Sequence, residues 1–445
     1  MKSFFIILNR LFVNKFFIIL FCILLFSSSI ISFILKINLS SLLGPQDLNL
    51  FLLDFDIKTR TGGVVNDLKT HWEYITYLKE NIANLFKLEM GVDTNLINFP
   101  LHNIIFSQIY FFNDSLKNYL LIVFIFSLSL PIIFFLCLRT RFKNINKYKL
   151  ILLSSIIYLL PAFQYSAIWG NNHIIALIFL TIGIFFHLKL KDYNYNSFKY
   201  YFLTVFFVSL ACYTRQYYAF FFLYLLLDFY LGIKIKYFLL NGIFLLILAS
   251  PGLIFLFNNP LVVFGYGQEI TNFTSSILIS ASIVLFYLLP FLFQYLINLP
   301  IKIEKNIPKI LNTKIFLVTL VITVCCVYTF KYESVVGGGI FYKIFILMLN
   351  NKTLFFCSSF LGIYSILFFC EKNIKNIFIS ILILITFSTC FFIFQKYFEP
   401  MFFILFLIYF DRNKILISIE KNNFFYIFYF SGYFLISNYI YFFGL

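Results

Sequence analysis

The sequence predicts an all-α integral membrane protein with about 13 transmembrane helices (11–13) and a long, partly helical first extracytoplasmic loop. Two numbers exclude a soluble fold. Apolar residues make up 62% of the 445 residues, and charged residues make up only 12%. A soluble protein carries about 25% charged residues, so this chain cannot cover its surface in water. A lipid bilayer is the solvent that fits this composition.

A third observation is the spacing of the apolar runs. A helix needs about 20 predominantly apolar residues to cross the hydrocarbon core. Runs of this kind, some of them shorter, are separated by short polar loops along the whole chain. We expect spans at approximately 16–37, 118–138, 150–168, 172–188, 200–214, 216–233, 237–257, 273–298, 315–330, 353–370, 376–395, 401–411 and 424–444. The 401–411 span needs extra length, backwards through Tyr397 or forwards through Ile415.

The apolar stretch 200–233 is divided by Arg215 and Gln216. As one helix it would be about 50 Å long, against a hydrocarbon core of about 30 Å. We therefore expect two helices that turn near Cys212–Tyr218. The turn places Arg215 at a membrane surface, since a charge at the membrane centre would be costly.

Charge in the loops predicts the orientation. With the N-terminus in the cytoplasm, 22 of the 34 Lys and Arg residues fall on the inner side. Seven of the other twelve belong to the long first loop or its edges, where the positive-inside rule applies weakly. The net charge of +16 is thus explained by topology, and nucleic-acid binding is not expected because no basic face carries a docking motif. We expect residues 1–445 to form one polytopic domain in a bacterial inner (cytoplasmic) membrane.

The first outside loop, residues 38–117, is the longest hydrophilic stretch and holds nine of the 18 acidic residues. Apolar residues recur at helical spacing from about 67 to 90, which predicts an amphipathic helix on the outer membrane surface. Asn66 can cap its start, so that Asp67 lies in the first turn. Helical geometry then places Asp67, His71 and Tyr74 on one face.

The order of motifs resembles a known family. Asn66-Asp67, then His71-Trp72, then Phe99-Pro100-Leu101 is similar to the first loop of GT-C glycosyltransferases, especially those that extend lipid-linked oligosaccharides. The family has two prolines where this chain has Pro100 alone. Tyr213-Thr214-Arg215-Gln216 and Gln395-Lys396-Tyr397-Phe398-Glu399-Pro400 resemble two later elements of the same family.

The resemblance implies transfer of a sugar from a polyprenyl-phosphate donor to a lipid-linked or cell-surface glycan acceptor at the outer membrane face. It implies that Asp67 is the catalytic base that activates an acceptor hydroxyl. The residues expected to bind substrate are His71, Trp72, His102, Arg215, Gln216, Lys396 and Tyr397.

No cofactor is indicated. The eight cysteines form no CxxC pair and no zinc spacing with the four histidines, so the sequence defines no metal site. A divalent metal is neither indicated nor excluded by the acidic residues near Asp67.

Candidate site residues can also be explained by a structural role instead of a functional one. Arg215 and Lys396 could be interfacial side chains that extend to the membrane surface. His71, His102 and His173 could be structural, and Trp72 an interfacial anchor. Two other functions also compete. A lipid-linked-glycan flippase or transporter would be expected to show internal repeats or midplane charges, and no repeat is found. A polysaccharide polymerase or ligase usually has its largest loop late in the chain.

Overall fold

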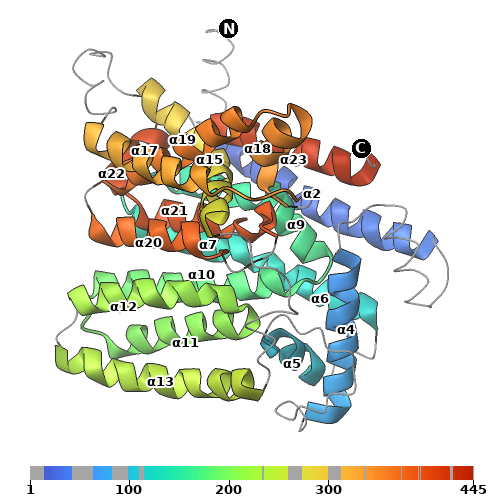
Figure 1. The fold of residues 1–445 in the computed structure, drawn as a ribbon. Coiled ribbons are helices and arrows are strands. Elements are labelled where there is room, and N and C mark those ends of the chain that lie inside the picture. Colours follow the sequence, from blue (N-terminus) through green and yellow to red (C-terminus); the bar gives the residue numbers. More distant parts are fainter. Residues whose placement is uncertain are drawn as a thin grey trace. The chain divides into compact units, whose positions relative to one another are not determined.

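The structure is a computed structural model that describes residues 15–42, 64–82, 99–109, 115–232, 235–258, 273–298, 312–334, 337–371, 373–388, 390, 392–420 and 424–443. Within these ranges the chain is helical and contains no strand, which confirms the all-α prediction (Figure 1). Many of these helices begin at an asparagine whose side-chain oxygen accepts a backbone N–H, a favoured N-terminal cap. These caps are Asn146, Asn171, Asn312, Asn351 and Asn373.

The contacts divide the chain into two compact units. The N-terminal unit lies within residues 15–219, 229–267 and 430–445, and the C-terminal unit lies within 220–228 and 268–429. A single polytopic domain therefore stays a prediction, and each unit is described by itself.

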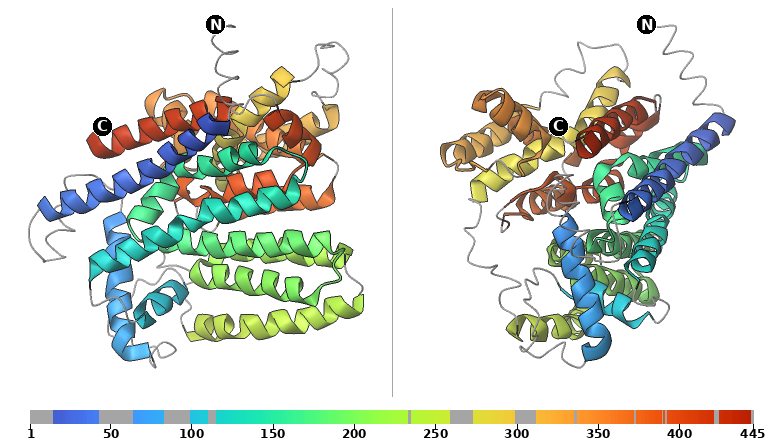
Figure 2. Two further views of the ribbon diagram at one scale, coloured as in Figure 1. Left: turned by 180° about the vertical axis from the view of Figure 1, so that it is seen from behind. Right: turned by 90° about the vertical axis from the view of Figure 1, so that its right-hand side faces the viewer.

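The N-terminal unit contains the first loop and the helices that follow it. Its helices are α2 (Lys15–Leu42), α4 (Val64–Asn81), α5 (Leu101–Gln108), α6 (Leu116–Ser127), α7 (Ser129–Arg141), α8 (Lys147–Ser155), η2 (Ile156–Leu159), α9 (Pro161–Ile168), α10 (Asn172–Asp192), α11 (Phe198–Thr214), η3 (Gln216–Ala219) and α13 (Ile235–Asn258). Helix α2 lies along α8 and α9 (Figure 2). Helices α10, α11 and α13 lie side by side, and α4 crosses near their ends with α5 beside it (Figure 1).

Small residues allow close helix packing in both units. A methyl group at Gly183 of α10 would come within 2.7 Å of the Val208 side chain on α11. In the C-terminal unit, α15 (Phe273–Asn298) meets α19 (Lys352–Cys370) at Gly362, where a methyl group would lie 2.0 Å from the Ala281 carbonyl oxygen. Glycine at these points lets the backbones approach, as at many membrane helix interfaces.

The C-terminal unit is built around the largely buried helix α15, against which α17, α18, α19, α20, α21 and α22 pack. The bounds of these helices are α17 (Thr313–Tyr328), α18 (Gly339–Tyr342), η4 (Lys343–Met348), α20 (Ile374–Ile385), η5 (Gln395–Tyr397), α21 (Met401–Tyr409) and α22 (Arg412–Glu420). Helix α12 (Phe220–Gly232) and helix α23 (Phe424–Phe443) complete the described helices.

Among the residues that the structure describes, five helices are long and apolar enough to cross a membrane, or six if a pair bent by 64° at Leu160 is one span. The five are Lys15–Ile34, Leu116–Arg141, Asn172–Asp192, Phe273–Ile297 and Lys352–Cys370, and the bent pair is Lys147–Leu159 with Pro161–Ile168. A multi-pass membrane protein is therefore supported, whereas the number 13 stays a prediction.

Two details of the predicted spans are settled by the helix boundaries. Helix α11 ends at Thr214 and Arg215 is extended, which confirms the turn predicted near Cys212–Tyr218. The expected extension of the 401–411 span was wrong. Helix α21 ends at Tyr409 because Phe410 is extended, and all nine residues of α21 are buried. At about 1.5 Å per residue α21 alone is shorter than a full span, and a crossing by residues 401–411 stays a prediction.

Candidate functional site in the N-terminal unit

Helix α4 carries the predicted amphipathic pattern. Leu68, His71, Tyr74 and Leu78 are buried on one face, while Glu73 and other polar residues are exposed. The apolar face packs on α5 of the protein itself, and a position on the membrane surface stays a prediction. The helix is already formed at Val64, so Asn66 lies inside it and the predicted cap at Asn66 was wrong. Residues 83–90, the second part of the predicted helix, lie outside the described residues.

Asp67 lies in the first turn of α4 and is half-buried. Its Oδ2 accepts a hydrogen bond of 3.4 Å from Nδ2 of Asn171. A carboxylate in the first turn of a helix is favoured by the partial positive charge of the helix N-terminus. The rival carboxylates Asp54 and Asp56 lie outside the described residues.

Asn171 and Asn172 hold the side chain of Arg215. Nη2 of Arg215 donates to Oδ1 of Asn171 at 2.8 Å, and Nε donates to Oδ1 of Asn172 at 2.6 Å. Both asparagines are buried, and Asn171 also caps α10 by accepting from the backbone N–H of His173 at 3.1 Å. The guanidinium is therefore held by two buried amides, and this geometry differs from that of a side chain that extends toward the headgroups.

Asn171 thus joins a carboxylate to a cation. Its amide donates to Asp67 with the nitrogen and accepts from Arg215 with the oxygen. The two charged groups approach from different elements, the start of α4 and the extended residue after α11. The Asn171 amide lies between Asp67 and Arg215 and so fixes the distance between their opposite charges. The side chains of Asp67 and Arg215 both stay half-exposed.

Two buried histidines lie next to this bridge. Nδ1–H of His71 donates to Oδ1 of Asn103 at 3.1 Å, and the His71 ring centroid lies 5.3 Å from that of His102. Nε2–H of His102 donates to the Tyr119 hydroxyl at 2.7 Å, and that hydroxyl donates to the Gly170 carbonyl oxygen. This arrangement leaves Nδ1 of His102 without a hydrogen-bond partner within the part of the chain that the structure describes.

Burial keeps both imidazoles neutral. It lowers the pKa of His71 to about 4; Asp67 and the hydrogen bond to Asn103 raise that pKa, and Arg215 lowers it further. Burial, followed by His71 and Arg215, brings the pKa of His102 well below its usual range. At neutral pH the two rings can therefore donate and accept hydrogen bonds, but they add no positive charge beside Arg215.

The other predicted residues of this unit lie nearby. Trp72 is half-buried, with its ring 5.8 Å from the Tyr119 ring. Gln216 follows Arg215 directly and begins η3. The structure thus brings together Asp67, His71, Trp72, His102 and Arg215, which are separated by up to 148 residues in the chain.

Lys396 and Tyr397 belong to the C-terminal unit. The Lys396 ammonium lies 5.2 Å from the Phe394 ring centroid, and the Tyr397 ring stacks on Phe387. Glu399 beside them is 1% exposed and accepts a hydrogen bond from the Tyr287 hydroxyl. Participation of Lys396 and Tyr397 in one site with Asp67 stays a prediction.

A loop with three successive glycines, residues 337–339, packs on the segment 393–396, which contains Lys396. Gly337, Gly338 and Gly339 all have φ between +76° and +83°, which favours glycine. The Gly338 N–H donates to the Ile393 carbonyl oxygen at 2.8 Å, and Oε1 of Gln395 accepts from the Ile340 N–H at 2.9 Å. The three glycines therefore let this loop hydrogen-bond to the segment.

The sequence did not indicate that Asn171 and Asn172 belong to the candidate site. The signal was the polar run Gly170-Asn171-Asn172-His173 between two apolar spans. A polar run there is ordinary for a loop, and nothing local shows that it meets Asp67 and Arg215. Among the described residues, no group of three or more His, Cys, Asp and Glu side chains could hold a metal ion.

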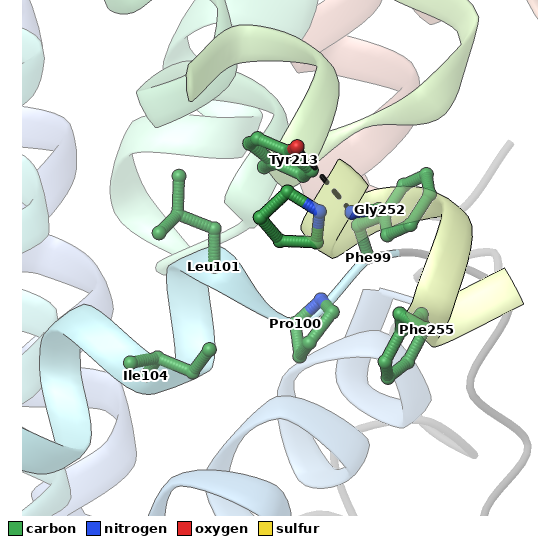
Figure 3. A pocket seen from close by; sticks show the side chains of 8 residues that line it. Phe99, Pro100, Leu101, Ile104, Tyr213, Gly252 and Phe255 are labelled. Atoms are coloured by element: carbon green, nitrogen blue, oxygen red, sulfur yellow. Dashed lines mark hydrogen bonds between the residues drawn. The ribbon is translucent and has the colours of Figure 1, made fainter. Parts of the chain in front are cut away.

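An apolar cavity of 160 Å³ lies in the same unit (Figure 3). Phe99, Pro100, Leu101 and Ile104 of the first loop form one wall, and Tyr213, Pro251, Gly252 and Phe255 form the other. The motif Phe99-Pro100-Leu101 is therefore part of this wall. Its charged neighbour in the chain is Arg215, two residues after Tyr213.

Comparisons with models of known protein families, with curated proteins and with solved structures found no match for this chain.

Proposed function

We propose that this protein is a multi-pass membrane glycosyltransferase of the GT-C type, which uses a polyprenyl-phosphate-linked sugar as its donor. The observation that carries the proposal is the bridge Asp67–Asn171–Arg215, in which one amide holds a half-buried carboxylate and a guanidinium side by side. This pair supplies the two charges that the reaction needs, a proton acceptor and a cation for the leaving phosphate.

In the proposed reaction, the acceptor hydroxyl oxygen attacks the anomeric carbon of the donor sugar. The hydroxyl proton passes to the Asp67 carboxylate. The bond from the anomeric carbon to the phosphate oxygen breaks, and its electron pair stays on the phosphate. The products are the glycosylated acceptor and a polyprenyl phosphate. A positioned carboxylate is an efficient general base for a hydroxyl group, which is a poor nucleophile while it keeps its proton.

Arg215 balances the charge that develops on the leaving phosphate. Two of its donor groups are held by Asn171 and Asn172, so the remaining N–H groups have a fixed direction. A cation positioned before the reaction stabilises the transition state without having to reorganise. The half-buried Trp72 supplies an aromatic face for a sugar, and the buried, neutral His71 and His102 position α4 and α5 through their hydrogen bonds.

The proposal includes a topology of about 13 spans. The N-terminus and the 139–149 loop lie in the cytoplasm, and residues 38–117 with the C-terminus lie outside. Reporter fusions at Lys147 and at Asn95, a residue outside the described ranges, should then report opposite sides. Fusions that report the same side would contradict the outer-face site.

The direct test is a transfer assay with the full-length protein in lipid nanodiscs. A polyprenyl-phosphate sugar should lose its sugar to a glycan acceptor, and free polyprenyl phosphate should appear in equal amount. Transport of an intact lipid-linked glycan across the membrane without cleavage would support a flippase and contradict the proposal. Elongation of a glycan from a diphosphate-linked donor would support a polymerase.

A further inference from the structure

We infer that Tyr119 of α6 is a positioning residue of the candidate site, because it ties the first loop to the turn that carries Asn171. The inference rests on the proposed function, since the site that Tyr119 positions is the proposed catalytic site. Tyr119 is 1% exposed, so its side chain does not reach a substrate. Its effect on the reaction passes through Asn171, the residue that bridges Asp67 and Arg215.

The Tyr119 hydroxyl joins two segments that are far apart in the chain. It accepts a hydrogen bond of 2.7 Å from Nε2–H of His102 in α5, and it donates to the carbonyl oxygen of Gly170. His102 and Gly170 are both buried. A buried polar group that loses its partner bears the full cost of its desolvation. The hydroxyl therefore fixes the separation of the two segments more strictly than ring packing alone.

Gly170 lies at the junction between α9 and α10. Its φ is +64°, and the backbone N–H of the next residue, Asn171, donates to the Ser166 carbonyl oxygen at 3.0 Å, which are features of a Schellman motif at the end of α9. The Gly170 carbonyl and the Asn171 N–H belong to one planar peptide unit. With Tyr119 on its oxygen and Ser166 on its nitrogen, this peptide unit is held at both ends.

The ring of Tyr119 packs on both helices of the first loop. The Trp72 ring of α4 lies 5.8 Å from it, and the rings of His102 and Phe106 in α5 meet it edge-on at 6.0 Å and 5.2 Å. At the turn, a methyl group on Gly170 would lie 2.7 Å from Cε1 of Tyr119, so glycine is needed to leave room for the ring. One side chain therefore contacts α4, α5 and the turn before α10.

These contacts hold both sides of the bridge between Asp67 and Asn171. The bridge is long for a hydrogen bond, with 3.4 Å between Nδ2 and Oδ2, so a small shift of either side breaks it. Asp67 belongs to α4, which packs on Tyr119 through Trp72, and Asn171 belongs to the peptide unit that Tyr119 holds. A displacement of about 1 Å at a catalytic group can lower a rate about a hundredfold. Tyr119 is thus placed to affect catalysis without touching the substrate.

The test compares Tyr119→Phe with the wild-type protein, both full-length and in lipid nanodiscs. The variant keeps the ring against Trp72 and Gly170 and removes only the hydroxyl. Hydrogen–deuterium exchange should be about tenfold faster in peptides that cover 165–176, because a buried carbonyl has lost its donor. Exchange in 178–188, farther along α10, should stay within about twofold of the wild-type rate, since the loss is local.

Tyr201→Phe is the matched control. Tyr201 is a buried tyrosine of the same unit, 3% exposed, and its hydroxyl has no hydrogen-bond partner within the residues that the structure describes. Loss of that hydroxyl should leave exchange in 165–176 unchanged.

A second variant covers the case in which Tyr119→Phe does not fold. Gly170→Ala perturbs the same contact from the turn, because its methyl group displaces the Tyr119 ring. Exchange should then become faster in 101–108, which is α5, although this helix is distant from position 170 in the chain. Unchanged exchange in 101–108 would contradict a connection through Tyr119.

The transfer assay separates a positioning role from a merely structural one. Tyr119→Phe should lower kcat about tenfold and change KM for the lipid donor by less than about twofold, because it disturbs the alignment of reacting groups and no substrate contact. In an Asn171→Ala background the same substitution should lower kcat by less than about twofold, since the residue through which Tyr119 acts has been removed. A structural residue would lower kcat equally in both backgrounds.

Equal effects in the two backgrounds, faster exchange along the whole of α10, or unchanged exchange in 165–176 would overturn the assignment. The result is separable from the proposed function. A protein that transfers no sugar would refute the proposed function, while the exchange data for Tyr119→Phe would still show whether Tyr119 holds the turn.

Discussion

The side chain of Asn171 donates a hydrogen bond to the carboxylate of Asp67 across 104 residues of sequence, with Nδ2 and Oδ2 3.4 Å apart. The same amide accepts from Arg215 at 2.8 Å. This relationship gives the first loop a defined place against the start of α10. It also turns three residues that have no common sequence motif into one polar site.

Removal of the proposed base is the first prediction. Asp67→Asn keeps the size of the side chain and its place in the first turn of α4, but it removes the negative charge. We expect the transfer rate to fall at least about a hundredfold, the low end of general-base effects. Glu73→Gln is the matched control, because Glu73 is exposed on the same helix. Retained activity in Asp67→Asn with loss in Asp54→Asn or Asp56→Asn would move the base to one of those residues.

The second prediction concerns the geometry of the cation. Arg215→Lys keeps the charge, but a lysine cannot donate to Asn171 and Asn172 in the same fork. Each charge-assisted hydrogen bond is worth about 1.5–3 kcal/mol, so kcat/KM for the lipid donor should fall by about tenfold to a hundredfold. In Arg215→Ala, kcat/KM for the lipid donor should fall further. Arg139→Ala removes an exposed guanidinium from α7 and should leave the kinetics unchanged. Normal kinetics in both Arg215 variants would favour an interfacial role.

The third prediction tests the bridge itself. Asn171→Asp keeps an acceptor for Arg215 but replaces the donor to Asp67 with a like charge. A like charge disfavours the ionised form of a carboxylate, so the acidic limb of the pH–rate profile should move to higher pH by about one unit. Asn172→Asp adds the same charge on the next residue, which contacts Arg215. An equal shift in both variants would indicate a general charge effect and contradict a bridge through Asn171.

The buried state of His71 predicts a dependence of stability on pH. The pKa of His71 is about 4 in the folded protein and about 6.5 in the unfolded chain, so the unfolded state binds the extra proton between these values. Stability should therefore fall as the pH is lowered through this window, on the order of 2 kcal/mol between pH 7 and pH 5. Thermal midpoints over this range measure the effect. His71→Gln should flatten the curve, and an unchanged slope in that variant would assign the effect to other groups.

An ion pair in the C-terminal unit predicts the last stability effect. Nζ of Lys375 lies 2.7 Å from Oδ1 of the fully buried Asp228. Lys375→Met leaves a buried carboxylate without its cation and should cost about 3–5 kcal/mol in free energy of unfolding. Asp228→Leu combined with Lys375→Met should regain most of this loss.

The exposed pair Lys143–Asp192 is the control for that measurement. Its nitrogen and oxygen are 2.9 Å apart, but the Lys143 side chain is 64% exposed. Solvent screens such a pair, so Lys143→Met should change the free energy of unfolding by less than about 1 kcal/mol. Similar losses in Lys143→Met and Lys375→Met would show that burial does not set the strength of these pairs.

The sequence by itself determined the features that depend on local composition and periodicity. Long apolar runs required helices and a lipid solvent, and the length of the 200–233 run required a break at Arg215. Helical spacing placed Asp67, His71 and Tyr74 on one face, and the structure adds that His71 and Tyr74 are buried. These features follow from one residue and its near neighbours, which is why they could be predicted without a structure.

Only the tertiary structure decided which polar groups meet. Asn171 and Asn172 belong to an ordinary polar turn, and their partners lie 104 and 43 residues away. Burial of α21 was also decided by packing, because a short apolar run reads the same way whether lipid or protein surrounds it. The cavity lined by Phe99, Tyr213 and Pro251 depends on segments that are far apart in the chain. Hydrogen bonds and close packing between distant segments leave no periodic pattern in the local sequence. Sequence patterns alone therefore do not predict these contacts.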